Sequence, residues 1–290
     1  MTQRLLLPLW LVAAVLSAAP ALAQQKENLA TAAIDAVLQK TAAPQKTAAT
    51  VEQNAQPLCS ARKELTRLDR PLTRTSQLLA AGLPIRIVAL GSSSTAGAGA
   101  SSPDASYPSR LAMDLRERFP DHEITVLNRG VNGEEAADML ARFQTTVIAE
   151  RPDLVLWQVG TNAVLRDNPI EPASSLIDKG IAQLKAIGAD VVLIDPQFAP
   201  KVIAKTKLTR MLDLLAFKAK QYNVNLFQRF AVMREWRERQ GIPFEAFVSA
   251  DELHMNDWSY ACVAKVMSDA IAEAATRPVA SASAQARSLR

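Results

Sequence analysis

Short apolar segments alternate with longer amphipathic segments over most of this chain. Five apolar runs are typical of buried parallel strands, at residues 85–90, 123–128, 153–159, 190–195 and 223–227. Helical spacing of apolar residues falls between and after them, at residues 107–119, 134–150, 172–187, 208–222, 230–240 and 257–275. This alternation predicts an α/β fold, a three-layer α/β/α sandwich around a mainly parallel five-stranded sheet. We expect the domain to span residues 58–276.

Polar and glycine residues gather where the predicted strands end. The first strand is followed by Gly91 and three serines, the second by a turn that contains Gly133, and the third by Gly160-Thr161-Asn162. A loop after the last strand and its helix holds Asp251 and His254. Ligands of open parallel sheets bind at the carboxyl ends of the strands. These loops therefore offer a hydroxyl, an amide and a carboxylate–imidazole pair, which are the groups that acyl transfer needs.

The chain has two histidines, and only one of them is placed for catalysis. A serine hydroxyl is a poor nucleophile near neutral pH unless a base takes its proton. His122 precedes a strand and so lies at the end of the sheet opposite to the strand exits. His254 is then the candidate base, and Asp251, three residues earlier, can fix the tautomer of its ring. Taken alone, such an Asp-x-x-His sequence is also typical of an ordinary loop before a helix.

Four segments, "ALGSSSTAG", "NRGVNGE", "QVGTN" and "DELH", resemble in this order the four sequence blocks of the SGNH (GDSL) hydrolases. The resemblance covers residues 85–275 and implies the flavodoxin-like fold of that family. It implies that Ser93 is the nucleophile, His254 the base and Asp251 its orienting acid. It also implies an oxyanion hole made of Ser93 N–H, Gly133 N–H and the Asn162 side chain. The expected activity is that of a serine esterase or lipase that works through an acyl-enzyme, with no metal and no organic cofactor.

Three positions depart from the pattern of that family. Ser92 replaces the aspartate of the Gly-Asp-Ser block, Ala163 replaces an aspartate that often follows Asn162, and Met255 replaces a proline. None of the three removes a catalytic group, but they bear on the hydrogen bonds that support the nucleophile loop. Ser93 is preferred over its two serine neighbours because the glycine of the block stands two residues before it.

Two other classes of function compete with an esterase. A phosphate-binding loop would need Gly-Lys-Ser/Thr, which is absent there, and the dinucleotide fingerprint would need a third glycine after Gly97 and Gly99. A non-catalytic carbohydrate-binding protein on the same fold is the second alternative, and the complete set of catalytic groups argues against it.

The sequence leaves the substrate open. O-acetyl groups on a polysaccharide or on peptidoglycan are the first expectation. A short-chain arylesterase, a thioesterase or a lysophospholipase is the alternative. Gln197 and Phe198 follow the fourth strand and are candidates for lining the acyl or alcohol pocket, or for a purely structural loop.

The N-terminal segment predicts export. Arg4 precedes an uncharged apolar run that ends in Ala21-Leu22-Ala23, the pattern of a signal peptide over residues 1–23. Pro8, Pro20 and this ending favour cleavage after Ala23 over an uncleaved anchor. We expect a periplasmic or secreted protein with no stable membrane span after cleavage, a leader at residues 24–57 rich in Ala, Gln and Thr, and a disordered tail at residues 277–290.

Composition limits which cross-links, metal sites and partners the protein can have. The two cysteines, Cys59 and Cys262, form one disulfide or remain two unpaired thiols, and the sequence does not decide between these. So few Cys and His side chains argue against a metal site. The net charge is +4, and no stripe of Lys and Arg is interleaved with aromatic residues, so a nucleic-acid partner is not expected.

Overall fold

The computed structural model describes residues 58–278. The predicted signal peptide, the leader and residues 279–290 of the predicted tail lie outside the described residues. Within residues 58–278, none of the helices has the length and apolar character needed to cross a membrane.

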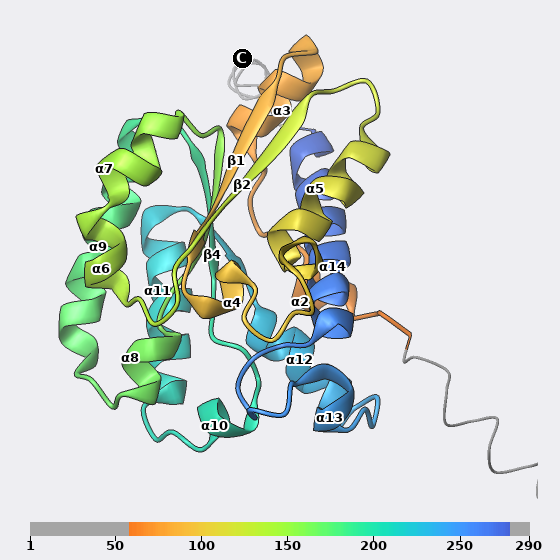
Figure 1. Ribbon diagram of the computed structural model, residues 1–290. Coiled ribbons are helices and arrows are strands. Elements are labelled where there is room, and N and C mark those ends of the chain that lie inside the picture. Colours follow the sequence, from red (N-terminus) through yellow and green to blue (C-terminus); the bar gives the residue numbers. More distant parts are fainter. Residues whose placement is uncertain (1–57, 279–290) are drawn as a thin grey trace, which may run out of the picture. The chain divides into compact units, whose positions relative to one another are not determined.

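Five parallel strands form one sheet in the order β2-β1-β3-β4-β5. They are β1 (Ile85–Gly91), β2 (Ile124–Gly130), β3 (Leu154–Gln158), β4 (Asp190–Ile194) and β5 (Asn225–Phe227). Figure 1 labels β1, β2 and β4 of this sheet. The predicted α/β fold with a parallel five-stranded sheet is confirmed. Each central strand is buried along nearly its whole length, which explains the continuous apolar runs in the sequence.

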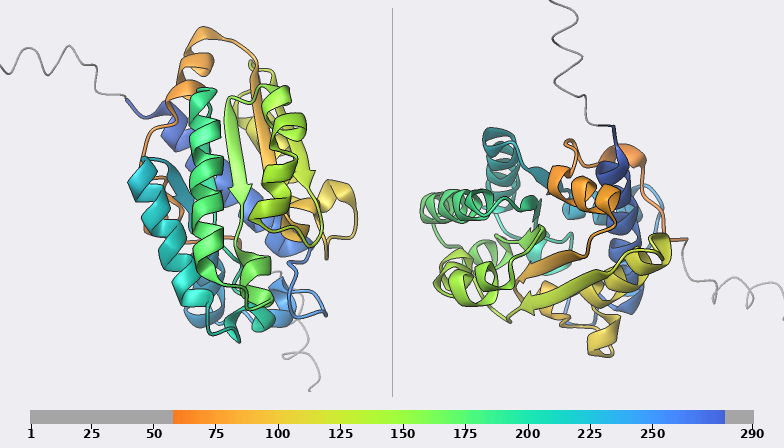
Figure 2. Two further views of the ribbon diagram at one scale, coloured as in Figure 1. Left: turned by 90° about the vertical axis from the view of Figure 1, so that its left-hand side faces the viewer. Right: turned by 90° about the horizontal axis from the view of Figure 1, so that it is seen from above.

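Helices cover both faces of the sheet (Figure 2). One layer contains α5 and α14, which pack on each other, and α3; the other contains α6, α9 and α11. The helices are α2 (Lys63–Thr66), α3 (Thr73–Ala81), α4 (Ser93–Ala96), α5 (Tyr107–Arg118), α6 (Ala136–Ala141), α7 (Phe143–Thr146), α8 (Thr161–Leu165), α9 (Ile170–Ala186), α10 (Pro200–Ile203), α11 (Leu208–Tyr222), α12 (Arg229–Glu238), α13 (Phe244–Phe247) and α14 (Asp257–Thr276), with 3₁₀ turns at Pro103–Ala105 and Ile148–Glu150.

The segment predicted as a single helix over residues 134–150 is broken into α6, α7 and the second 3₁₀ turn. The break falls at Arg142, whose guanidinium turns back to the Glu134 carboxylate and to the carbonyl of Arg129. Residues 145–148 are all β-branched, which lowers their helix propensity. The prediction of one continuous helix was therefore wrong.

Trp157 is the centre of the core between the sheet and the layer of α6 and α9. Its ring is fully buried, meets Phe143 edge-on at a centroid distance of 5.4 Å, and donates from Nε1 to Met139 Sδ. Gly180 on α9 makes room for it, since a Cβ there would lie 2.3 Å from the indole ring. This close approach holds α9 against β3.

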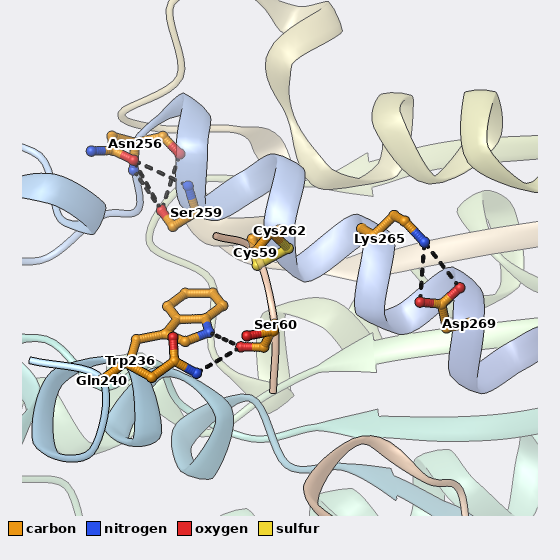
Figure 3. Close-up of a disulfide and its surroundings, with 9 residues drawn as sticks. All are labelled: Cys59, Ser60, Trp236, Gln240, Asn256, Ser259, Cys262, Lys265 and Asp269. Atoms are coloured by element: carbon orange, nitrogen blue, oxygen red, sulfur yellow. Dashed lines mark hydrogen bonds and ion pairs between the residues drawn. A yellow bond between two sulfur atoms is a disulfide. The ribbon is translucent and has the colours of Figure 1, made fainter. Parts of the chain in front are cut away.

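A disulfide joins Cys59 to Cys262 on α14, with a Cα–Cα distance of 5.3 Å (Figure 3). The carbonyl of the next residue, Ser60, accepts from Trp236 Nε1 on α12 and from Gln240 Nε2 just after α12, each at 3.0 Å (Figure 3). The structure thus ties the start of the described chain to two helices at once. The alternative of two unpaired thiols does not apply to this structure.

Candidate active site

Ser93 lies where β1 ends and a short helix begins. It is the first residue of α4, which ends at Ala96 and is followed by Gly97 as its C-cap, and Ser93 is half-buried. Ser92 precedes it as the N-cap, and the Ser92 carbonyl accepts from the N–H groups of Thr95 and Ala96 at 3.0 and 2.9 Å. These bonds fix the peptide that carries the Ser93 N–H, so both the hydroxyl and the amide of Ser93 project from a defined turn.

The structure brings the three predicted catalytic side chains together. Ser93 Oγ lies 2.8 Å from His254 Nε2, and His254 Nδ1 lies 2.5 Å from Asp251 Oδ2. Because the carboxylate can only accept, Nδ1 carries the ring proton and leaves Nε2 free to accept the proton of the Ser93 hydroxyl. This is the order of contacts that makes a serine hydroxyl nucleophilic.

Asp251 and His254 belong to a tight loop whose ends are pinned together. Val248 and Met255 form an antiparallel bridge, and the N–H of Ser249 donates to the carbonyl of His254 at 2.8 Å. Within the loop, Asp251 Oδ1 accepts from the N–H groups of Leu253 and His254, both at 2.9 Å, and from the Ser249 hydroxyl at 2.8 Å. The same carboxylate therefore folds the loop and orients the ring.

The hydrogen bonds of Asp251 also set its charge. Partial burial raises the pKa of this carboxyl, but the donors of His254, Leu253 and Ser249 outweigh it and hold the pKa well below the usual range. The group stays ionised whenever the protein is folded near neutral pH. Ser249 was missed by the sequence analysis, although a serine two residues before an aspartate in a turn is a recognisable local pattern.

Gly99 explains why the nucleophile loop is rich in glycine. Its φ is +87°, and a Cβ there would lie 2.4 Å from the carbonyl oxygen of Met255 and 2.9 Å from Cβ of His254. Only a glycine combines this left-handed conformation with so close an approach. The glycines after Ser93 thus let the nucleophile loop rest against the histidine loop.

The remaining candidates for the oxyanion hole come from the two strands beside β1. Gly91 pairs with Gly130 at the end of β2, and Leu90 pairs with Trp157 near the end of β3, so the following loops leave the sheet at one edge. Gly133 is left-handed, with a φ of +78°. Asn162 is the second residue of α8.

Two arginines that the sequence analysis missed hold the Gly133–Glu134 backbone. Arg166 donates to the carbonyl of Gly133 at 2.8 Å, and Arg142 binds both carboxylate oxygens of Glu134. The Glu134 carbonyl in turn accepts from Nδ2 of Asn162 at 2.8 Å. An amide nitrogen has two hydrogens, so Asn162 retains a second one for a substrate oxygen. The sequence did not reveal the roles of these arginines, because their hydrogen-bond partners lie 8 and 33 residues away along the chain.

Gln197 and Phe198, the candidates for lining a substrate pocket, lie in the interior. They are 1% and 6% exposed. Both ends of the Gln197 amide are hydrogen-bonded to protein groups. The Phe198 ring packs between Phe230 and Phe244 at centroid distances of 5.2 and 5.5 Å. These contacts favour the structural alternative for both residues over a lining role.

His122 takes no part in this site. Its Nε2 lies 2.9 Å from the carbonyl of Leu79 at the other end of the sheet, as the sequence order predicts. Among residues 58–278, no group of three or more His, Cys, Asp or Glu side chains is arranged to hold a metal ion.

Comparison with known proteins places the chain among lipase-like esterases. The model of the Non-GDSL lipase-like family matches residues 58–277. An arylesterase of Vibrio mimicus is 28% identical over 156 residues, which are 53% of this chain and 69% of that protein. An acetylxylan esterase of Geobacillus stearothermophilus is 38% identical over 52 residues, which are 18% of this chain and 24% of that one.

Solved structures show the same fold. A two-domain esterase active on acetylated mannans superimposes with a TM-score of 0.64 at 21% identity, over 74% of this chain and 57% of that one. The chain thus spans less than two thirds of the length of that two-domain protein.

Proposed function

Since the chain belongs to the Non-GDSL lipase-like family and is an ester hydrolase, we propose that it uses Ser93, His254 and Asp251 as its catalytic triad. The observation that carries this proposal is the continuous set of contacts from Ser93 Oγ through the imidazole to the Asp251 carboxylate. These contacts match a catalytic triad, in which the histidine takes the proton of the serine hydroxyl and the carboxylate orients the ring and stabilises the imidazolium.

The first half of the reaction forms an acyl-enzyme. His254 Nε2 takes the hydroxyl proton while Ser93 Oγ forms a bond to the ester carbonyl carbon, and the carbonyl oxygen becomes an oxyanion. The N–H groups of Ser93 and Gly133 and the second Nδ2 hydrogen of Asn162 are the donors that stabilise it. The intermediate collapses when His254 gives its proton to the departing alkoxide, which leaves as the alcohol.

The second half returns the enzyme. A water molecule takes the place of the alcohol, His254 Nε2 removes one of its protons, and the resulting hydroxide attacks the acyl carbon. The same donors stabilise the second oxyanion, and His254 then protonates Ser93 Oγ as the carboxylic acid leaves. None of these steps calls for a metal or an organic cofactor.

We further propose that the substrate is an O-acetyl ester of a polysaccharide or of peptidoglycan, outside the cytoplasm. The support is the acetylxylan esterase among the relatives and the mannan-active esterase among the structural neighbours, together with the signal-peptide pattern of residues 1–23. The arylesterase relative favours, as the alternative, a small aryl or alkyl ester.

Acyl-chain selectivity and polymer turnover test the substrate proposal together. We expect turnover of p-nitrophenyl acetate to exceed that of longer p-nitrophenyl esters, and acetate to be released from acetylated xylan, acetylated mannan or O-acetylated peptidoglycan. Fast turnover of long-chain esters with no acetate released from any polymer would contradict the deacetylase and favour a lipid or thioester substrate. Export is tested by expressing the full chain with and without residues 1–23 and sequencing the mature N-terminus, which we expect at Gln24.

A further inference from the structure

Ser92, which stands where the resembled family has an aspartate, is held by a glutamine of the neighbouring strand. Gln158 Oε1 accepts from the Ser92 N–H at 2.8 Å, from the Ser92 hydroxyl at 3.0 Å and from the Thr95 hydroxyl at 3.3 Å. All three residues are at most 1% exposed. Gly91 makes the approach feasible, because a Cβ there would lie 2.7 Å from Gln158 Oε1. One buried oxygen thus gathers three donors around the residue before the nucleophile.

The other end of Gln158 leads away from this loop along the carboxyl edge of the sheet. Its Nε2 donates to the Thr161 hydroxyl at 3.4 Å, and that hydroxyl donates to Gln197 Oε1 at 3.2 Å. Gln197 Nε2 then donates to the carbonyl of Leu253 at 3.2 Å, one residue before His254. A single buried chain of side chains therefore runs from the nucleophile loop to the histidine loop.

The chemistry of the end groups fixes the direction of every bond in this chain. The Ser92 N–H can only donate, so Gln158 must present its oxygen to it and its nitrogen to Thr161. The Leu253 carbonyl can only accept, so Gln197 must present its nitrogen there. Arg229 enforces the same orientation from the other side, because its Nη2 donates to Gln197 Oε1 at 3.0 Å. Neither amide can flip without breaking a bond at each end.

Arg229 holds Gln197 from outside this row of hydrogen bonds. It is 1% exposed, and its Nε donates to the carbonyl of Asp195 at 3.0 Å, directly after β4. Such a buried guanidinium costs free energy to desolvate, and its hydrogen bonds to the Asp195 carbonyl and to Gln197 fix its direction. Arg229 thus holds the Gln197 side chain in place, and Gln197 in turn holds the Leu253–His254 backbone.

From these contacts we infer that Gln158 and Gln197 are positioning residues that hold the nucleophile loop and the histidine loop at a fixed separation. The inference rests on the proposed function, in which Ser93 and His254 react together. Gln158 acts through Ser92 on Ser93, and Gln197 acts through Leu253 on His254. Neither glutamine touches the substrate.

The test compares Gln158→Met with Ile177→Ala. Methionine keeps the length of glutamine but offers no oxygen acceptor, whereas Ile177→Ala removes only apolar contacts of α9 from a fully buried position. With p-nitrophenyl acetate we expect kcat of Gln158→Met to fall about 10- to 100-fold, since small misplacements of reacting groups have effects of this size, and KM to stay within about twofold. Labelling by a fluorophosphonate should slow in proportion. Ile177→Ala, assayed well below its melting temperature, should keep kcat within about twofold.

A double variant tests whether the two glutamines act through one chain. Gln197→Met alone should also lower kcat, and Gln158→Met with Gln197→Met should lose less than the product of the two single effects, because either change already breaks the chain. Thr161→Val, which interrupts the middle link, replaces Gln158→Met in the comparison if the latter does not fold.

The outcomes separate this inference from the proposed function. Wild-type turnover that survives in Ser93→Ala would overturn the proposed function itself. Ser93-dependent turnover with kcat of Gln158→Met within twofold of wild type would overturn the inference alone. So would an equal loss in Ile177→Ala, or fully multiplicative effects in the double variant.

Discussion

Nδ1 of His254 lies 2.5 Å from Oδ2 of Asp251, and the other oxygen of that carboxylate binds the backbone N–H of the same histidine at 2.9 Å. One carboxylate thus fixes both the ring and the backbone of the residue that it orients. The local fold of the loop and the proposed catalytic contact therefore depend on the two oxygens of the same side chain.

We predict from this double contact that Asp251→Asn lowers kcat about 10²- to 10⁴-fold. The asparagine Oδ1 can still accept from the backbone, so the loop keeps its shape, but the amide nitrogen faces Nδ1 and favours the wrong tautomer. Ser249→Ala is the matched control, since it removes one donor to Asp251 and leaves the ring contact, and should cost less than about fivefold. Steady-state kinetics of both variants decide; an Asp251→Asn enzyme within twofold of wild type would contradict the assigned role.

Asn162→Ala should lower kcat about 10²- to 10³-fold with little change in KM, because an oxyanion donor acts mainly in the transition state. Asn168→Ala is the control: this asparagine, three residues after α8 ends, also donates from its side chain, to Glu135 at 2.9 Å. It should retain kcat within about threefold. Equal losses in the two variants would show that Asn162 supports the loop only.

Asp195 predicts a pH dependence of stability. Burial raises the pKa of its carboxyl to about 7, although the Phe230 N–H and Arg229 lower it. Between about pH 4 and pH 7, the folded protein therefore keeps a proton that the unfolded chain, with an ordinary pKa of 3.8, has already released. The free energy of unfolding should fall as pH rises through this window, by at most about 1.4 kcal/mol per pH unit from this group.

Urea unfolding of wild type and Asp195→Asn at several pH values between 4 and 8 measures this contribution. The asparagine retains an oxygen acceptor for the Phe230 N–H and has no proton to lose, so its stability should decline less steeply over that range. Parallel curves for the two proteins would contradict the raised pKa.

The disulfide between Cys59 and Cys262 closes a loop of 203 residues in sequence separation. Replacing both cysteines by serine, which leaves no odd thiol, should lower the free energy of unfolding by about 3–5 kcal/mol. The bridge lies at Cys262 within α14, outside the loop that holds Asp251 and His254, so activity well below the melting temperature should persist. Calorimetry of the double variant, and of wild type with and without reductant, tests this; identical melting temperatures would contradict it.

The fold was predictable because strands buried on both faces leave an unmistakable apolar run. All five strands lie where those runs predict them, to within two residues at each end, and the helix at residues 208–222 matches α11. The segment at residues 134–150 failed because its break depends on where the Arg142 side chain goes, which is a tertiary contact. Helical spacing in the sequence carries no information about that contact.

The candidate site divides along the same line. Ser93, Asp251 and His254 stand in recognisable sequence blocks, and the position of Ser93 directly after the first predicted strand places it at the carboxyl edge of the sheet. Arg229 stands in no such block, and Gln158, although it opens the segment "QVGTN", looks in sequence like any polar residue at a strand end. Their partners lie 32 to 66 residues away, so only the folded structure reveals them.

Hydrolysis of p-nitrophenyl acetate by wild type and by Ser93→Ala, with fluorophosphonate labelling of both, tests the central claim most directly. We predict that wild type turns over the ester and is labelled, and that Ser93→Ala, folded to the same melting temperature within a few degrees, does neither. Turnover or labelling of Ser93→Ala at the wild-type rate would contradict Ser93 as the nucleophile and the mechanism built on it.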